Sequence, residues 1–141
     1  MTIDEFLKDF IETSKLELSY NIQPGSEYHE IELQGKDAGI LLARNAEGLK
    51  ALEYLINRIF EKSGLKFLMD SGGYRASRAE ELRLMALTAA DNVKRTGRAF
   101  KFNPMESDER RIVHLAVADD KLVRTESEGA GGKRQVVIYP S

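Results

Sequence analysis

One short stretch of the C-terminal half combines cationic and aromatic side chains at helical spacing: Glu109-Arg110-Arg111-Ile112-Val113-His114. At about 100° per residue, Arg110 and His114 lie about 40° apart on a helix, and Arg111 lies about 100° from Arg110. An arginine can bind a phosphate through its forked guanidinium, and a histidine ring can stack on an unpaired base. This helix face is therefore a candidate contact for single-stranded nucleic acid.

The same spacing also fits a helix that is merely solvated. In that alternative, Arg110 forms an ion pair with Glu106 one turn earlier. In both cases the apolar side of the helix is expected to consist of Met105, Ile112, Leu115 and Ala116. Spacing alone does not choose between the two interpretations.

Further basic residues extend the candidate patch. They are Arg75 and Arg78 at the start of an expected helix, Arg98 after the end of that helix, and Lys133 and Arg134 in a glycine-rich turn. A flexible basic loop can follow a phosphate backbone. Each of these five residues fits a purely solubilising role equally well.

The residue types argue against catalysis. The chain has no cysteine and only two histidines, and it contains no zinc-protease, Walker or nucleophile-elbow motif. A ribonuclease that uses His114 as a base and Glu109 as an acid is one alternative. A metal pair at Asp119 and Asp120 is another, although adjacent acids at a helix end are more often solvated caps. We expect no catalytic residue, no cofactor and no metal site.

Charge is divided unevenly along the chain. Residues 1–73 contain 8 Lys/Arg and 13 Asp/Glu, a balance of −5, whereas residues 74–141 contain 13 Lys/Arg and 10 Asp/Glu, a balance of +3. Such asymmetry indicates that one half handles a polyanion. No segment approaches the roughly 18 consecutive apolar residues of a membrane-spanning helix, and the acidic N-terminus is unlike a signal peptide. A cytoplasmic protein without membrane insertion is therefore expected.

Hydrophobic periodicity predicts an α+β fold of two small α/β sandwich modules, 1–73 and 74–141, joined at Gly72-Gly73. The first is expected to run α-β-β-α-α-β, with a helix at 3–11, strands at 16–22 and 28–33, helices within 37–62 on either side of a turn at 43–46, and a strand at 65–69. The second is expected to run α-β-α-β-β, with a helix from 74 to 97, a strand at 98–103, a helix at 105–118, and strands at 122–127 and 135–139.

The predicted turn of the first module, Ala43-Arg44-Asn45-Ala46, occupies the place of the Gly-x-x-Gly loop with which KH domains hold nucleic acid. In that loop the glycines let a phosphate approach backbone amides at a helix N-terminus. Both glycines are alanines here, and Glu47 adds a negative charge in the next turn. We expect this degenerate loop to bind weakly or not at all. If these positions lie inside a helix, restoring the glycines would lower helix stability by about 1 kcal/mol per site.

Three groups of segments together resemble the Jag (SpoIIIJ-associated) family of bacterial RNA-binding proteins, which join a type II KH domain to an arginine-x3-histidine (R-3-H) domain. The C-terminal group is Pro104-Met105, Glu109 to Ala116, Val123 to Gly129 and Val136 to Ile138. The second is the junction Asp70-Ser71-Gly72-Gly73-Tyr74-Arg75, and the third is the helix Leu49 to Leu55. The likeness covers nearly the whole chain.

The resemblance implies binding of single-stranded RNA without catalysis, with Arg110 and His114 matching the two residues that name the R-3-H domain. It also implies a small KH-domain protein or a second copy as partner, and links to cell elongation and to the membrane-protein insertase. Two departures stand out: Ala-Arg-Asn-Ala replaces the usual Gly-Arg-Arg-Gly, and the chain starts at the KH helix without the additional N-terminal domain of many members.

Two functions follow as hypotheses. In the first, the second module leads RNA binding, and single-stranded DNA is not distinguished from RNA, because an exposed arginine and histidine do not read the 2′-hydroxyl. In the second, the chain is an interaction or dimerisation module with little RNA affinity of its own. RNA targets and base preference are not encoded in any recognisable pattern.

Overall fold

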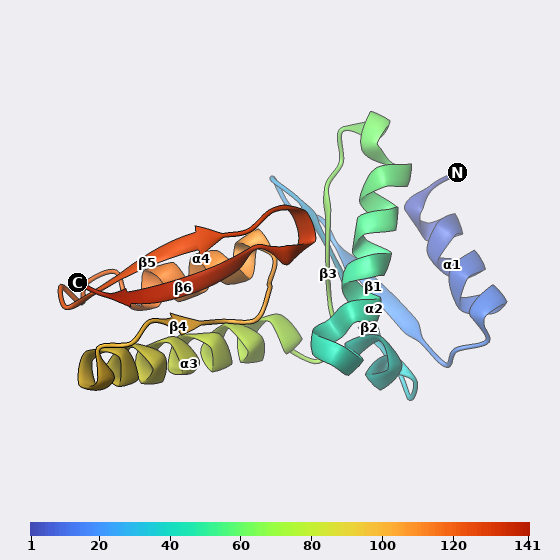
Figure 1. The fold of residues 1–141 in the computed structure, drawn as a ribbon. Coiled ribbons are helices and arrows are strands. Elements are labelled where there is room, and N and C mark those ends of the chain that lie inside the picture. The colour runs from blue at the N-terminus through green and yellow to red at the C-terminus, as the bar shows by residue number, and fades with distance from the viewer. The chain divides into compact units, whose positions relative to one another are not determined.

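The computed structural model describes all 141 residues, and the chain is a mixed α+β protein with two small sheets. The chain divides into two compact units, Met1–Arg75 and Ala76–Ser141. Figure 1 labels the elements of both. None of the helices combines the length and the apolar character that a membrane-spanning segment requires.

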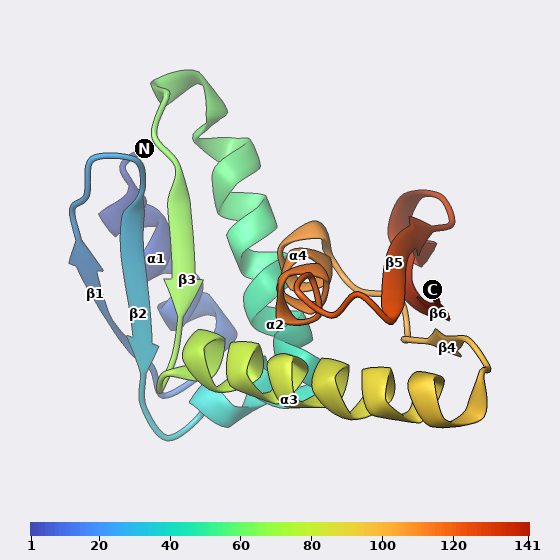
Figure 2. The ribbon, with the colours of Figure 1, turned by 90° about the vertical axis from the view of Figure 1, so that its left-hand side faces the viewer.

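The first unit packs two helices on one face of a three-stranded sheet (Figure 2). Helix α1 spans Ile3–Ser14, and the strands are β1 (Ser19–Gln23), β2 (His29–Gln34) and β3 (Phe67–Asp70). In the strand order β1-β2-β3, β1 is antiparallel to β2 and β2 is parallel to β3. Every second residue of β2 and β3 points into the core, which contains Leu7, Ile31, Leu33, Leu49, Ile56, Phe67 and Met69.

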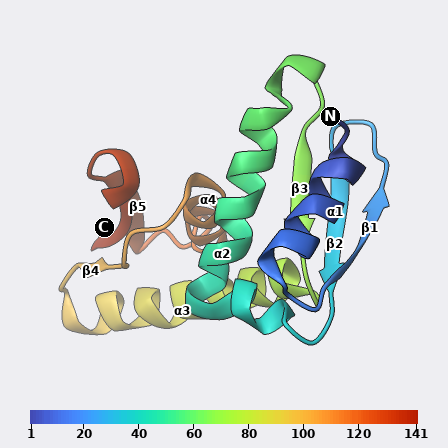
Figure 3. The same cartoon turned by 90° about the vertical axis from the view of Figure 1, so that its right-hand side faces the viewer.

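Helix α2, Ala38–Ile59, is two helices that meet at a corner (Figure 3). Ala43 is extended, with φ −60° and ψ 149°, and the next three residues have φ between 56° and 60°, the left-handed region. The turn predicted at 43–46 is confirmed. Gly48 permits the close approach of the two halves, since a Cβ there would lie 3.2 Å from the Leu41 Cα atom. A short 3-10 helix, Glu61–Ser63, leads from α2 toward β3.

Side chains, and not another strand, satisfy the free edge of β3. The Asn57 amide donates to the Phe67 carbonyl oxygen (2.9 Å) and accepts from the Phe67 N–H (2.8 Å). The Met69 N–H donates to the Glu53 carboxylate (2.7 Å), and the Met69 carbonyl oxygen accepts from Nε of Arg75 (2.7 Å). Arg75 and Glu53 also form an ion pair. The backbone groups of this edge are therefore already bonded, which protects an edge strand from pairing with another chain.

The second unit contains α3 (Tyr74–Thr96), most of which belongs to it, and α4 (Ser107–Ala116). Its strands are β4 (Phe100–Lys101), β5 (Val123–Glu128) and β6 (Gln135–Pro140), with a 3-10 turn at Gly131–Lys133. The sheet is antiparallel in the order β4-β6-β5. The helices bury one core against it, including Leu82, Ala86, Val93, Phe102, Val113, Val136 and Ile138. The expected element order α-β-α-β-β is confirmed.

Helix α3 begins in the first unit and continues into the second. The expected joint, Gly72-Gly73, has left-handed φ values of 58° and 71° at the two glycines. The structural division nevertheless falls after Arg75. Tyr74 packs against the core of the first unit and Arg75 binds its β3 edge, so the opening residues of α3 belong with the preceding sheet.

Candidate functional site

Helix α4 carries the predicted arginine and histidine, and its buried side differs from the predicted one. Glu109 and Val113, one turn apart, are buried, and Val117 follows just after the helix. Met105, Ile112 and Ala116 pack against the core only partly, as flanks of this stripe. The prediction that Leu115 faces the core is wrong, because 63% of this residue is exposed.

The Glu109 carboxylate can lie within the buried stripe because it binds a buried guanidinium, that of Arg78. The Glu109 carboxylate accepts from Nε of Arg78 at 2.9 Å, and the two side chains are 7% and 13% exposed. Arg78 lies within 3.3 Å of Glu81 as well. Burial by itself would lower the pKa of Arg78, but its hydrogen bond to Glu109 and the charges of both carboxylates raise that pKa overall. The guanidinium of Arg78 is thus held inside the unit.

Arg110 is anchored to the chain that precedes α4. Its guanidinium donates to the Met105 carbonyl oxygen at 2.8 Å, and not to Glu106 as the solvated-helix interpretation expects. The Met105 N–H in turn donates to the Arg134 carbonyl oxygen at 3.1 Å. One of the five N–H groups of the guanidinium is used in this bond, and the side chain is half-buried, so donors remain for a ligand.

His114 is half-buried and both of its ring nitrogens are bonded to β5. Nδ1 lies 2.6 Å from the Thr125 hydroxyl and Nε2 lies 2.8 Å from the Ser127 hydroxyl. Burial, and secondarily the positive charge of Arg110, lower the pKa of His114 below its ordinary value. The ring is therefore neutral at pH 7, where one nitrogen donates and the other accepts. His114 orients two hydroxyls and does not act as a free cation.

Arg134 closes the turn between β5 and β6 and links it to the same network. Its guanidinium donates to the Gly129 carbonyl oxygen (3.0 Å) and to the Ser127 carbonyl oxygen (3.4 Å). Gly129 has φ 98°, and a Cβ there would lie 2.7 Å from the Lys133 carbonyl oxygen, so the turn requires glycine. We call the connected residues the α4–β5 cluster: Arg110, His114, Thr125, Ser127 and Arg134.

Not every predicted contact joins the cluster. Arg111 and Lys133 are exposed, next in sequence to cluster residues. Arg98 is exposed beyond the C-terminus of α3, next to the start of β4. Arg75 belongs to the first unit, where it binds Glu53 and the Met69 carbonyl oxygen. The structure therefore brings together Arg110, His114 and Arg134 from the sequence-based set.

Sequence reasoning missed Thr125 and Ser127. The signal that could have found them is their spacing, because two hydroxyl residues at i and i+2 of a strand point to the same face. The sequence does not indicate which helix residue contacts that face of β5. The histidine lies 11 and 13 residues earlier in the chain, and only the fold supplies its distance to the two hydroxyls.

In the first unit, the Ala43–Ala46 corner presents one exposed cation, Arg44, which is a weak candidate for binding a phosphate. Arg44 lies 3.8 Å from Glu47, with both side chains largely exposed, so that carboxylate competes with any phosphate for the arginine. Ala46 is fully buried in the core. Neither alanine of the loop has helical dihedral angles, so the helix penalty expected for glycine at these two positions does not apply.

Arg44→Gly is expected to stabilise the first unit by about 0.5–1 kcal/mol, because a left-handed backbone strains residues other than glycine. Ala43→Gly is the matched control. Its φ of −60° suits alanine, so glycine there should destabilise by a similar amount through the greater freedom of the unfolded chain. Urea unfolding of the full chain, followed by amide signals of β2, measures both. An equal change in the free energy of unfolding for the two substitutions would contradict the left-handed backbone at Arg44.

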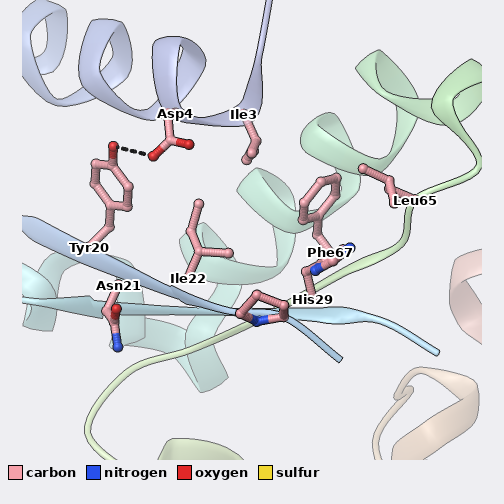
Figure 4. A pocket seen from close by; sticks show the side chains of 9 residues that line it. Ile3, Asp4, Tyr20, Asn21, Ile22, His29, Leu65 and Phe67 are labelled. Carbon is pink, nitrogen blue, oxygen red and sulfur yellow. Dashed lines mark hydrogen bonds between the residues drawn. The ribbon is translucent and has the colours of Figure 1, made fainter. Parts of the chain in front are cut away.

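An open pocket of about 530 Å³ lies between α1 and the first sheet (Figure 4). The Tyr20 hydroxyl donates to the Asp4 carboxylate at 2.8 Å, and this bond raises the pKa of Tyr20. The His29 and Phe67 rings are in contact, with centroids 5.8 Å apart. The tyrosine and the carboxylate are thus bonded to each other, and this pocket groups no nucleophile with a base.

Three carboxylates of the first unit, Glu30, Glu32 and Asp70, have oxygens within 4.8 Å of one another. Backbone donors occupy two of them. The Gly72 N–H donates to Glu32 (2.9 Å), and the Ser71 and Arg75 N–H groups donate to Asp70 (2.8 and 3.2 Å). These bonds give the carboxylates a structural role at the start of α3.

Comparison with known proteins points to the same part of the chain as the geometry. A family model described as the R-3-H domain matches residues 80–140. The chain is 34% identical to the RNA-binding protein KhpB of Clostridium symbiosum over 95% of its own length, and 31% identical to KhpB of Bacillus subtilis over 79%. It spans 63% and 54% of those two relatives. The matched residues, 80–140, include the whole α4–β5 cluster.

Proposed function

We propose that the chain binds single-stranded RNA in the bacterial cytoplasm, mainly through the α4–β5 cluster. The main observation behind this proposal is the arrangement of the cluster: Arg110 lies beside a neutral His114, which orients the Thr125 and Ser127 hydroxyls. The similar KhpB proteins are named as RNA-binding proteins, which supports the proposal. The balance of +3 in residues 74–141 supports it further, since cations dominate affinity for a polyanion.

In the proposed complex, the free N–H groups of Arg110 bind a phosphate, and the two hydroxyls add neutral hydrogen bonds to phosphate or ribose. His114 acts as a positioning residue, because both of its nitrogens are already bonded. Arg111 and Lys133 add screened, longer-range attraction. Arg78 is not part of this surface, because Glu109 and Glu81 hold its guanidinium.

The first unit is, in this proposal, a KH-like module with a degenerate loop. Its order of elements and the corner at Ala43–Ala46 support that view. Its balance of −5, together with Glu47 beside Arg44, makes it the weaker RNA contact. This unit is also the surface proposed for a small KH-domain partner or a second copy, which is the competing function.

Arg110→Ala is expected to weaken binding of a labelled single-stranded RNA about ten-fold at low salt, because a hydrogen bond to a charged group contributes about 1.5–3 kcal/mol. The slope of log affinity against log salt should become shallower by about one phosphate contact. Arg124→Ala is the matched control, because Arg124 neighbours Thr125 on β5 and so faces the other side of the sheet. Fluorescence anisotropy across a salt series measures all three proteins.

Equal affinity and slope for Arg110→Ala and the unchanged chain would contradict the assignment of the cluster. No RNA binding by the unchanged chain, combined with a dimer in size-exclusion chromatography with light scattering, would favour the competing function. Single-stranded DNA of matching sequence, measured in parallel, tests whether the 2′-hydroxyl contributes.

A further inference from the structure

Another surface of the second unit has the features of a nucleobase site, and it lies along β4, at the edge of the sheet opposite to β5. An open groove of about 390 Å³ runs between α3 and β4. Leu84, Thr88 and Asn92, spaced one turn apart on α3, line one side, and Phe100 lines the other. Phe100 is 38% exposed, so part of its ring faces solvent.

The Phe100 ring is held in a fixed orientation by its surroundings. Phe102, two residues on and almost fully buried, meets it edge to face, with ring centroids 5.0 Å apart and planes at 75°. The backbone of β4 pairs with β6, with Phe100 opposite Ile138. An aromatic ring that is ordered before binding loses little conformational freedom when a ligand stacks on it.

One exposed cation lies close to the ring in sequence. Arg98 is exposed two residues before Phe100, whereas Lys101 lies between Phe100 and Phe102 on the strand and therefore faces the other side of the sheet. Glu81, the one acidic residue that lines the groove, is engaged by Arg78 at 3.3 Å. Asp91, on the same helix, is engaged by Lys94 at 3.4 Å. An exposed ring with an exposed arginine two residues away favours a ligand that is both aromatic and anionic.

We propose that this groove binds an unpaired base of single-stranded RNA, with Phe100 as the stacking platform and with Arg98 as a phosphate contact. Stacking on an aromatic ring combined with neighbouring cations is how single strands bind without base pairing. The proposal rests on the proposed function and extends it to a second contact on the same unit.

A peptide strand added to the edge of β4 is the competing occupant, and β4 suits it poorly. The Phe102 N–H donates to the Val136 carbonyl oxygen, and Phe100 is paired with Ile138, so the backbone groups of both phenylalanines point toward β6. In an antiparallel ladder, only Lys101 between them then has an N–H and a carbonyl oxygen at the free edge. Strand addition gains affinity from a row of main-chain hydrogen bonds. A strand of two residues does not supply such a row.

The absence of tryptophan from the chain allows a direct test. Phe100→Trp places the sole tryptophan at the platform, and Leu122→Trp, at an exposed site just before β5, is the control. Adding a short single-stranded RNA of mixed sequence to the full chain should quench the fluorescence of the first variant and leave the second largely unchanged, because stacking requires contact between base and ring. Equal quenching of both variants, or of neither, would overturn the proposal.

Affinity provides an independent measurement. Phe100→Leu keeps an apolar side chain but removes the ring, and it should weaken RNA binding by roughly five-fold to a hundred-fold, the range seen for single stacked bases. Leu122→Ala controls for loss of an exposed apolar side chain, and circular dichroism confirms that each variant is folded. Arg98→Ala should make the salt dependence shallower by about one phosphate contact, and Lys101→Ala, on the other face of β4, controls for the loss of one positive charge.

The outcomes separate this proposal from the proposed function. If the chain binds RNA with an Arg110-dependent affinity that Phe100→Leu leaves unchanged, the groove proposal fails alone, and the groove becomes a candidate protein-docking surface. If the unchanged chain binds no single-stranded RNA, both fail. Weakening by Phe100→Leu together with selective quenching of Phe100→Trp supports the platform.

Discussion

Glu109→Ala is expected to lower the free energy of unfolding of the second unit by about 3–5 kcal/mol, the largest effect we predict for a single polar side chain here. The change leaves the Arg78 guanidinium buried without its main counter-charge, since the two side chains are only 13% and 7% exposed. Glu81 lies at 3.3 Å from Arg78 but is largely exposed, so solvent screens its compensation. Hydrogen exchange of the β6 amides in the full chain reports the stability of this unit.

Two further variants show whether the effect comes from the buried charge. Glu81→Gln should cost less than about 1 kcal/mol, because an exposed ion pair contributes little. Replacing both partners, Arg78→Met with Glu109→Met, should recover much of the loss, since the uncompensated charge is then gone. A loss below 1 kcal/mol for Glu109→Ala would mean that water or another group replaces the carboxylate.

Asn57→Ala is expected to destabilise the first unit by about 2–4 kcal/mol, because it leaves both the N–H and the carbonyl oxygen of Phe67 without a partner. These backbone groups are bonded by the Asn57 amide at 2.8 and 2.9 Å at the free edge of β3. Hydrogen exchange of the β2 and β3 amides in the full chain measures the change.

Asn57→Asp keeps an acceptor for the Phe67 N–H but lacks the donor for its carbonyl oxygen, so an intermediate loss is expected. Arg58→Ala, the next residue, removes only an exposed ion pair with Glu61 and should change stability by less than about 0.5 kcal/mol. If Asn57→Ala costs no more than Arg58→Ala, solvent satisfies this edge and the side chain is not required.

Local patterns predicted the elements well, because they depend on residues that are close in sequence. The corner at Ala43–Ala46 follows from an interruption of helical periodicity. The strands of both sheets follow from alternation and from their turn residues, although β1 and β3 begin a few residues later than predicted. The existence and order of elements could therefore be predicted before their pairing was known.

Partnerships between distant residues could not be predicted in this way. Arg78 and Glu109 are 31 residues apart, and nothing in the periodicity of either helix indicates that the carboxylate faces inward. The same limit applied to His114, whose spacing suggested a free surface ring although both of its nitrogens are bonded to β5. Spacing identified the residues of the candidate site, and long-range contacts determine their chemical state.

The contact of Arg75 with the β3 edge affects how the protein can be divided for experiments. A fragment cut at the glycine pair, ending at Gly73, would lack the donor for the Met69 carbonyl oxygen and the cation that binds Glu53. Loss of RNA binding or of folding in such a fragment would then reflect the missing arginine and not the properties of the unit. A faithful N-terminal fragment has to retain the first turn of α3, including Tyr74 and Arg75.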